Sequence, residues 1–463
     1  MTTTDSAPRP RLIDQAKPPS PLAGRLATQS LLFALGEGTF MAGSAVFFIE
    51  VVGLTKIQVG VGLTIAGIAA FIAAYPMGRV VDRLGAKRCW AISSAGQAAM
   101  FMVWPFIDSF QGFVTMAVAM EVIGALGGVA YGAYTIDVLP PQERVTSRAY
   151  MYSALNVGFT LGALLAMIAL VPDSLTVLMV VPVFTGLVFA FNAFCIRRLP
   201  DAPHDLKSTE ERKVKVPGAG PMRNVGWLAT TFLLGVLWTN QVVLNLIIPL
   251  WLVTETDAPK VVLALLFGTN TVMCIVLPMA AARGVKDNRT ALRAIRISTV
   301  FFVVSCVITL STHESIGWAT IALFFLGHVT LTGAELFLSA ASWTFEAELM
   351  DPRRRGEYQG AAELSGTLGR VWAPAAFTIL VSLGGTGWLA IASIITVAAA
   401  ALHPTTAMAR RFLERHVPAD VLAEASASED PDDLAPVGPP TMEQPAEPGG
   451  VSRLPQSTGG NTL

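Results

Sequence analysis

Acidic side chains inside long apolar runs are the residues of this sequence best placed to do chemistry. Glu37 stands about ten residues into the first run, in LFALGEGTF, and Glu121 lies about a third of the way into a later one. A charge at the centre of a bilayer costs about 2.5–3.5 kcal/mol on insertion scales, so such a residue needs a role or a partner. Burial favours the protonated carboxyl, which lets Glu37 alternate between two protonation states. We favour a proton or cation site at Glu37 over a permanently protonated, hydrogen-bonded carboxyl. For Glu121 a proton or substrate contact and a structural hydrogen bond are equally open.

Further along the chain, two pairs of ionisable residues repeat one spacing. His328 and Glu335 are seven residues apart, as are Glu363 and Arg370, and this spacing places each pair on one helix face. An arginine in mid-membrane needs a partner, which Glu335 or Glu363 could supply. Such a pair could hold helices together or clamp a ligand. His328 could relay protons, although a neutral, hydrogen-bonded histidine is the commoner case.

A third group is polar without being charged. Asn240, Gln241 and Asn245 share one apolar run, with Gln241 and Asn245 at i, i+4 on a common face. Either a ligand contact or hydrogen bonding between helices explains them.

The elements that position these residues are apolar runs long enough to cross a membrane. Only 14% of the residues are charged, against about 25% in a typical soluble protein. Backbone groups in lipid must bond within their own segment, so each run is expected to be a helix. Twelve spans are predicted, at about 27–52, 58–78, 89–107, 112–138, 149–171, 175–195, 226–253, 260–282, 292–311, 315–345, 358–383 and 387–409.

Lys and Arg are concentrated in alternate connections, which predicts the orientation. They precede the first span, fill every second connection and follow the last span, whereas the intervening connections offer only Lys56 and Lys260. By the positive-inside rule both termini are cytoplasmic. The polar, proline-rich start lacks the order of a signal peptide, so the first run is expected to remain as a span of the cytoplasmic membrane.

The chain divides into two similar halves. We predict a cytoplasmic segment at 1–25, a six-helix bundle at 26–196, a linker at 197–224, a second bundle at 225–413 and a disordered acidic tail at 414–463. A shift of 202 residues places LATQSLL on LATTFLL and Pro76-Met77 on Pro278-Met279. The fold class is therefore all-α and polytopic, with twelve helices in two parallel six-helix repeats and a site between them.

The stretch PMGRVVDRLGAKR, after the second span, carries the most specific motif. It keeps the residues of the pattern G-x-L-A-D-R-x-G-R-K as Gly78, Asp82, Arg83, Gly85 and Lys87. With this organisation the chain resembles the major facilitator superfamily, closest to its twelve-helix drug/proton antiporters. The resemblance implies an inner gate in which Asp82 and Arg83 bond to helix ends across the interface and Gly78 and Gly85 permit close packing.

Two antiporter motifs are altered. The R-x-x-Q-G motif of the fourth helix has Glu121 in place of its arginine, and Gly158 to Ala163 lacks the final proline of the fifth-helix motif. The resemblance implies alternating access by a monomer, with helices one, four, seven and ten around the cavity.

The charges inside the spans are mostly acidic, which favours a cationic or neutral amphipathic substrate. Proton-coupled export is the leading hypothesis, proton-coupled uptake of a metabolite the alternative, and a non-transporting sensor a third. The chain has no P-loop, HExxH or Cys/His metal spacing. We expect no ATPase or other enzymatic activity, no cofactor, no metal and no nucleic-acid partner.

Overall fold

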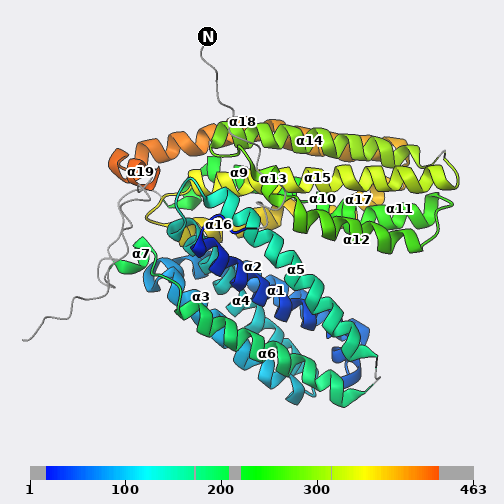
Figure 1. The fold of residues 1–463 in the computed structure, drawn as a ribbon, viewed down its shortest axis with the longest axis horizontal. Helices are drawn as coiled ribbons and strands as arrows, with labels where there is room; N and C mark the ends of the chain where they lie inside the picture. The colour runs from blue at the N-terminus through cyan, green and yellow to red at the C-terminus, as the bar shows by residue number, and fades with distance from the viewer. Residues whose placement is uncertain (1–16, 172–173, 208–219, 314, 427–463) are drawn as a thin grey trace, which may run out of the picture. The chain divides into compact units, whose positions relative to one another are not determined.

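Helices make up the regular structure of the described residues. The structure, a computed structural model, describes residues 17–171, 174–207, 220–313 and 315–426 (Figure 1). The first part of the chain contains α1 (Pro21–Val46), the π-helix η2 (Phe47–Val51), α2 (Lys56–Leu84), α3 (Ala86–Val103), the short 3-10 helix η3 (Trp104–Phe106), α4 (Phe110–Val138), α5 (Arg144–Leu170), α6 (Leu175–Arg197) and α7 (Pro203–Leu206).

The second part begins with η4 (Pro221–Arg223). It continues with α9 (Val225–Leu237), α10 (Asn240–Val242), the π-helix η5 (Val243–Ile247), α11 (Ile248–Glu255), α12 (Val261–Val276), α13 (Pro278–Ala282), α14 (Asn288–Ser311), α15 (Trp318–Glu348), α16 (Arg355–Arg370), α17 (Ala373–Val381), α18 (Gly385–His416) and α19 (Ala419–Ser426).

Ten helical segments of the described chain are long and apolar enough to cross a membrane. The two remaining predicted spans fall on shorter or more polar helices. The span predicted at 89–107 is α3, which buries Ser93, Ser94 and Gln97. The span predicted at 260–282 is divided into α12 and α13 by a break before Pro278. Its counterpart Pro76 lies inside the unbroken helix α2.

Large apolar side chains face outward on these helices, as a lipid environment requires. Along α2 the exposed residues recur at helical spacing and form one stripe, made of Val61, Ile65, Ile68 and Ile72. Such a stripe would be unfavourable in water. The protein is therefore a multi-pass membrane protein.

Glycines bring two helix pairs into close backbone contact. A side chain at Gly162 of α5 would meet the carbonyl oxygen of Leu35 in α1 at 2.6 Å. In the second part of the chain, Gly369 of α16 lies in the same way against the backbone of Phe232 in α9. Small residues at such crossings are what helix association in membranes requires.

Two spans of the second part are interrupted near their middle. Helix α9 ends at Leu237 and the chain resumes as α10 at Asn240, followed by the π-turn η5. Helix α16 ends at Arg370, and α17 begins at Ala373, just before Pro374. Interrupted helices in a membrane mark places where backbone lines a cavity or is covered by protein. Both interruptions adjoin predicted site residues.

Two connections are more ordered than the sequence suggests. The linker at 197–224, whose charge, Pro and Gly content predicts an unpacked segment, contains α7, and α7 lies against α3 and α4. In the tail, expected to be disordered, α18 continues to His416 and α19 occupies Ala419–Ser426. Both expectations are wrong for these residues; 427–463 and 208–219 lie outside the described residues. The sequence does not predict the tail helix because this helix depends on tertiary packing. Its apolar residues, among them Val421 and Leu422, pack on the core of the second part.

Candidate functional site

The carboxylate of Asp82 joins the two parts of the chain. Asp82 lies in the last turn of α2 and accepts hydrogen bonds from the backbone N–H groups of Gly356 and Glu357, at 2.7 and 2.8 Å. These groups belong to the first turn of α16, where N–H groups have no intrahelical partner and the helix dipole favours negative charge. Asp82 thus caps a helix 274 residues away, as the motif predicts.

Glycines make this contact possible. A Cβ at Gly78 would collide with the carbonyl group of Gly356, and one at Gly360 would meet the carbonyl oxygen of Ala74 at 2.5 Å. Gly85 has a φ of +96° and lies between the end of α2 and the start of α3. Since L residues avoid this conformation, Gly85 allows the chain to reverse immediately after Asp82. The predicted roles of Gly78 and Gly85 therefore have a geometric basis.

The linker also binds the turn between α2 and α3. The Asp205 carboxylate of α7 accepts hydrogen bonds from the backbone N–H groups of Ala86 and Lys87, at 2.7 and 3.1 Å, which caps α3. Burial raises the pKa of Asp205, and these two bonds partly offset the effect. Lys87 donates to Asp201 at 2.8 Å, so its partner is the linker. Arg83 is exposed and makes no hydrogen bond or ion pair with the described residues, contrary to the bridging role expected for it.

Two ion pairs, each with a buried arginine, extend the same contact. Arg355, at the start of α16, pairs with Asp137 at the end of α4, which also accepts from the His204 N–H at 2.8 Å. Arg148 of α5 pairs with Glu346 of α15 at 2.6 Å. We call this region, defined by Asp82, Asp137, Arg148 and their partners, the Asp82 end. At this end α2, α4 and α5 are bonded to α15 and α16.

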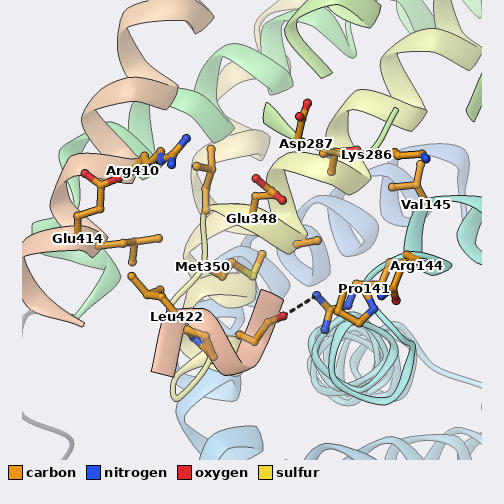
Figure 2. Close-up of a pocket in the computed structure, with 17 residues that line it drawn as sticks. Pro141, Arg144, Val145, Lys286, Asp287, Glu348, Met350, Arg410, Glu414 and Leu422 are labelled. Carbon is orange, nitrogen blue, oxygen red and sulfur yellow. Dashed lines mark hydrogen bonds and ion pairs between the residues drawn. The ribbon is translucent and has the colours of Figure 1, made fainter. Parts of the chain in front are cut away.

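A pocket of about 540 Å³ opens at the Asp82 end, between the start of α5, the end of α15, α18 and α19 (Figure 2). Its charged lining is mixed, with Arg144, Lys286, Arg410, Asp287, Glu348 and Glu414. Arg144 donates to the carbonyl oxygen of Ala425 at 3.4 Å, which ties α19 to α5. The pocket lies apart from the acids predicted inside the spans.

Glu37 lies in α1 and Glu121 lies in α4. The charge of Glu121 acts on Glu37 across the first part of the chain. Neither carboxyl makes a hydrogen bond or ion pair with the described residues. The glycines beside Glu37 serve helix packing, since a Cβ at Gly36 would meet the Phe189 ring of α6 at 2.8 Å. Two unneutralised carboxyls inside the spans are unusual, because an intramembrane charge normally has a partner.

The polar residues of the seventh predicted span lie at its interruption. Asn240 is 2% exposed and its side-chain oxygen has no partner among the described residues. Asn245 donates to the side-chain oxygen of Gln241 at 3.3 Å, so the predicted common face is confirmed. Asn245 is exposed and lies in η5; single π-turns of this kind occur often at functional sites.

Glu335 and Glu363 were the two partners proposed for Arg370, and Glu363 is the one that lies beside it. Their charged groups are 3.9 Å apart and both side chains are accessible, 58% and 46% exposed. An accessible pair of this kind stabilises helix packing little. Glu335 instead binds Tyr152 of α5. His328 is buried, and the backbone of Leu266 in α12 lies beside its ring.

Comparison with known proteins identifies the family. The model of the Major Facilitator Superfamily matches residues 26–374. The chain belongs to this superfamily. A comparison with curated protein sequences gave no match.

Solved structures of other proteins with the superfamily fold resemble it over most of its length. A bacterial homologue of the iron transporter ferroportin, in an outward-facing state, is 17% identical with a TM-score of 0.63, covering 86% of this chain and 100% of its own. The human organic anion transporter MFSD10 is 16% identical with a TM-score of 0.59, covering 83% and 100%. The proton:xylose symporter XylE is 12% identical with a TM-score of 0.61, covering 86% and 95%. At these identities the similarity shows a shared fold.

Sequence reasoning missed part of the Asp82 end of this superfamily member. In the sequence, Asp137 stands at the hydrated end of the predicted span 112–138, and Arg148 and Arg355 stand among the basic residues of two connections. Each of their partners lies about 200 residues away, at 218 for Asp137 and 198 for Arg148. The sequence feature that could have indicated this contact is Asp137 itself, because it is the one acidic residue of the second half of α4.

Proposed function

We propose that this protein is a secondary active transporter that exports a cationic or neutral amphipathic small molecule in exchange for protons. The observation that carries the proposal is the pair Glu37 and Glu121, two carboxyls inside the spans that lack any partner among the described residues. Unpaired acids of this kind can take up a proton or a cation in turn, and a cation carrier needs both forms.

Twelve membrane crossings in two six-helix bundles, residues 26–196 and 225–413, provide the framework. In this proposal α3 and the α12–α13 pair cross the membrane beside the ten longer segments. The Lys and Arg pattern supports a cytoplasmic location for the Asp82 end and for both termini, in a cytoplasmic membrane. The bonds of Asp82, Asp137 and Arg148 then close the cytoplasmic side, and the structure corresponds to an outward-facing state.

The substrate path in this proposal lies between the bundles. Glu37 and Glu121 contribute from the first bundle, and Asn240, Gln241, Asn245, Glu363 and Arg370 from the second, around the interrupted helices. Interrupted helices and accessible charges at mid-span accompany substrate sites in transporters. Acids exceed bases among these residues, which favours a cation over an anion. The protein acts as a monomer in the bilayer, and protons are the coupling ion.

Proton release from inside-out vesicles tests the proposal. Vesicles carrying the wild type, Glu37→Gln or the control Glu50→Gln are energised, and cationic amphipathic compounds are added one at a time. Glu50 is exposed at the end of the first span and lies outside the proposed path. Transported compounds should release protons through the wild type and Glu50→Gln, and not through Glu37→Gln. Equal release by all three proteins would remove Glu37 from the coupling.

The same experiment separates export from uptake. Proton-coupled uptake is the second candidate, because one cavity that opens to each side in turn serves both directions. A compound that is transported with the proton gradient, accumulating on the side to which protons flow, would establish uptake. No proton movement with any transported compound would contradict proton coupling.

A further inference from the structure

One exposed face of α14 changes from arginine to valine along the helix. The face is a row of six exposed side chains, spaced three or four residues apart, which are Arg289, Arg293, Arg296, Val300, Val304 and Val307. Helix α14 packs against α15 and α18 (Figure 1), and its exposed valines face lipid. The three arginines, which we call the arginine row, are in line with these valines and therefore face the same surroundings.

The arginine row is not neutralised by the described part of the protein. The side chains of Arg293 and Arg296 make no hydrogen bond or ion pair with the described residues. The acid next to the row is Asp287, which caps α14. Its carboxylate already accepts the N–H and the hydroxyl of Thr290, at 2.8 and 2.7 Å. The guanidinium groups of the row are thus available to a ligand from outside the protein.

The length of α14 places the arginine row at the edge of the membrane. The helix has 24 residues, Asn288–Ser311, and begins at the Asp82 end, where Asp287 lines the pocket. A hydrocarbon core of about 30 Å that begins at Ser311 ends after about 20 residues, between Arg289 and Arg293. A charge that faces hydrocarbon is unfavourable, so Arg293 and Arg296 must extend toward the headgroups, with their apolar stems along the helix. The acceptors at that level are lipid phosphates.

The equivalent helix of the first half lacks this row. Helix α3 begins at Ala86 and α14 at Asn288, 202 residues later, which is the shift of the internal repeat. Arg293 and Arg296 therefore correspond to Ala91 and Ser94, which are small and buried. The six-helix fold does not require arginines at these positions, which favours a role in binding.

We propose that the arginine row binds the headgroup phosphate of an anionic phospholipid in the leaflet at the Asp82 end. A guanidinium group binds phosphate through two parallel hydrogen bonds. A zwitterionic headgroup carries its own cation, whereas the row offers three positive charges, so a headgroup with net negative charge is preferred. The acyl chains of the bound lipid lie along Val300 and Val304, a contact that free phosphate does not make. This binding is independent of the exported substrate and of the coupling ion.

Native mass spectrometry of the full-length protein tests the proposal. The protein in detergent is titrated with phosphatidylglycerol or with phosphatidylcholine of the same acyl chains, and the affinity for the first bound lipid is measured. One basic residue at the membrane surface contributes about fivefold in affinity for anionic lipid. Arg293→Gln should therefore weaken phosphatidylglycerol binding about fivefold, and Arg293→Gln with Arg296→Gln about 25-fold. Binding of phosphatidylcholine should not change.

Arg88→Gln is the matched control. Arg88 is an exposed arginine in the first turn of α3, and its side chain makes no hydrogen bond or ion pair with the described residues. Four residues farther along, the exposed Ile92 follows it instead of a second arginine. Arg88→Gln should retain the wild-type affinity for phosphatidylglycerol. As a second measurement, phosphatidylglycerol should raise the melting temperature of the wild type more than that of the double variant.

Four outcomes would overturn the proposal. One is equal affinity of the wild type for the two lipids, and another is wild-type affinity in the double variant. Were the double variant not to fold, unchanged binding in Arg289→Gln and Arg293→Gln would have the same meaning. Loss of the preference for phosphatidylglycerol in excess inorganic phosphate would assign the row to a soluble anion. A rise in phosphatidylglycerol affinity after neutralisation of the tail acids Glu429, Asp430, Asp432 and Asp433 would assign it to the protein's own tail.

Discussion

Replacing Asp82 by asparagine is expected to open the Asp82 end. The substitution keeps the shape of the side chain, and removes its charge and one of the two acceptors that bind Gly356 and Glu357. A hydrogen bond to a charged group contributes about 1.5–3 kcal/mol, and a charge at a helix N-terminus contributes about 0.3–1 kcal/mol, more when partly buried. Loss of one bond and of the dipole interaction therefore costs about 3 kcal/mol, which is about a hundredfold in the closing equilibrium.

Amide exchange at Gly356 and Glu357 measures this equilibrium without any knowledge of the substrate. Their protection at pH 8 should fall about a hundredfold in Asp82→Asn, while the protein stays folded and in the membrane. Arg79→Gln is the matched control. It removes an ion pair with Glu357 at 3.6 Å in which the arginine is 55% exposed, and exposed pairs contribute at most about 1 kcal/mol, so protection should change less than about fivefold. Wild-type protection in Asp82→Asn would refute the reasoning.

Three further predictions follow from the same contacts. Gly78→Ala places a methyl group against the Gly356 carbonyl, so it should lower protection of the 355–360 peptide, whereas Gly67→Ala, with open space around its Cβ, should not. Arg355→Gln leaves Asp137 buried without its ion partner and should destabilise the closed state by about 3 kcal/mol; adding Asp137→Asn should restore part of the loss in amide exchange, and no restoration would show that the pair is not coupled. Burial raises the pKa of Asp205 above its ordinary value of 3.8, so the folded protein favours the protonated acid, and this stabilisation disappears as pH rises through the raised pKa. The melting temperature of Asp205→Asn relative to wild type should therefore increase from pH 4 to pH 6, and a difference that stays constant would contradict the burial effect.

The sequence was sufficient to locate the contact of Asp82 because its residues carry two signals at once. An aspartate among basic residues in a short turn is not explained by orientation alone, and glycines on both sides of it indicate close packing. The spans were also predictable, since a bilayer demands long apolar helices. Both signals are local.

The partners across the interface could not be predicted, because nothing local distinguishes them from hydrated loop charges. Tyr152 and Glu335 are 183 residues apart, and neither residue indicates the other. The interruption at Trp238 and Thr239 contains neither glycine nor proline, so tertiary packing decides it. At α17, by contrast, Pro374 was a usable signal for a break that the sequence reasoning passed over. The linker contact depends on two aspartates: Asp205 caps α3, and Asp201 accepts from the Lys87 side chain. Both roles appear only when the linker meets α3.

The measurement that tests alternating access most directly is the distance between the two bundles at the Asp82 end. Spin labels at Arg83→Cys and Arg289→Cys, both exposed positions, would be placed in protein whose four native cysteines are replaced by serine. Pulsed electron resonance should resolve a short and a long distance, with Asp82→Asn shifting the population strongly toward the long one. A single short distance in both proteins would contradict the account.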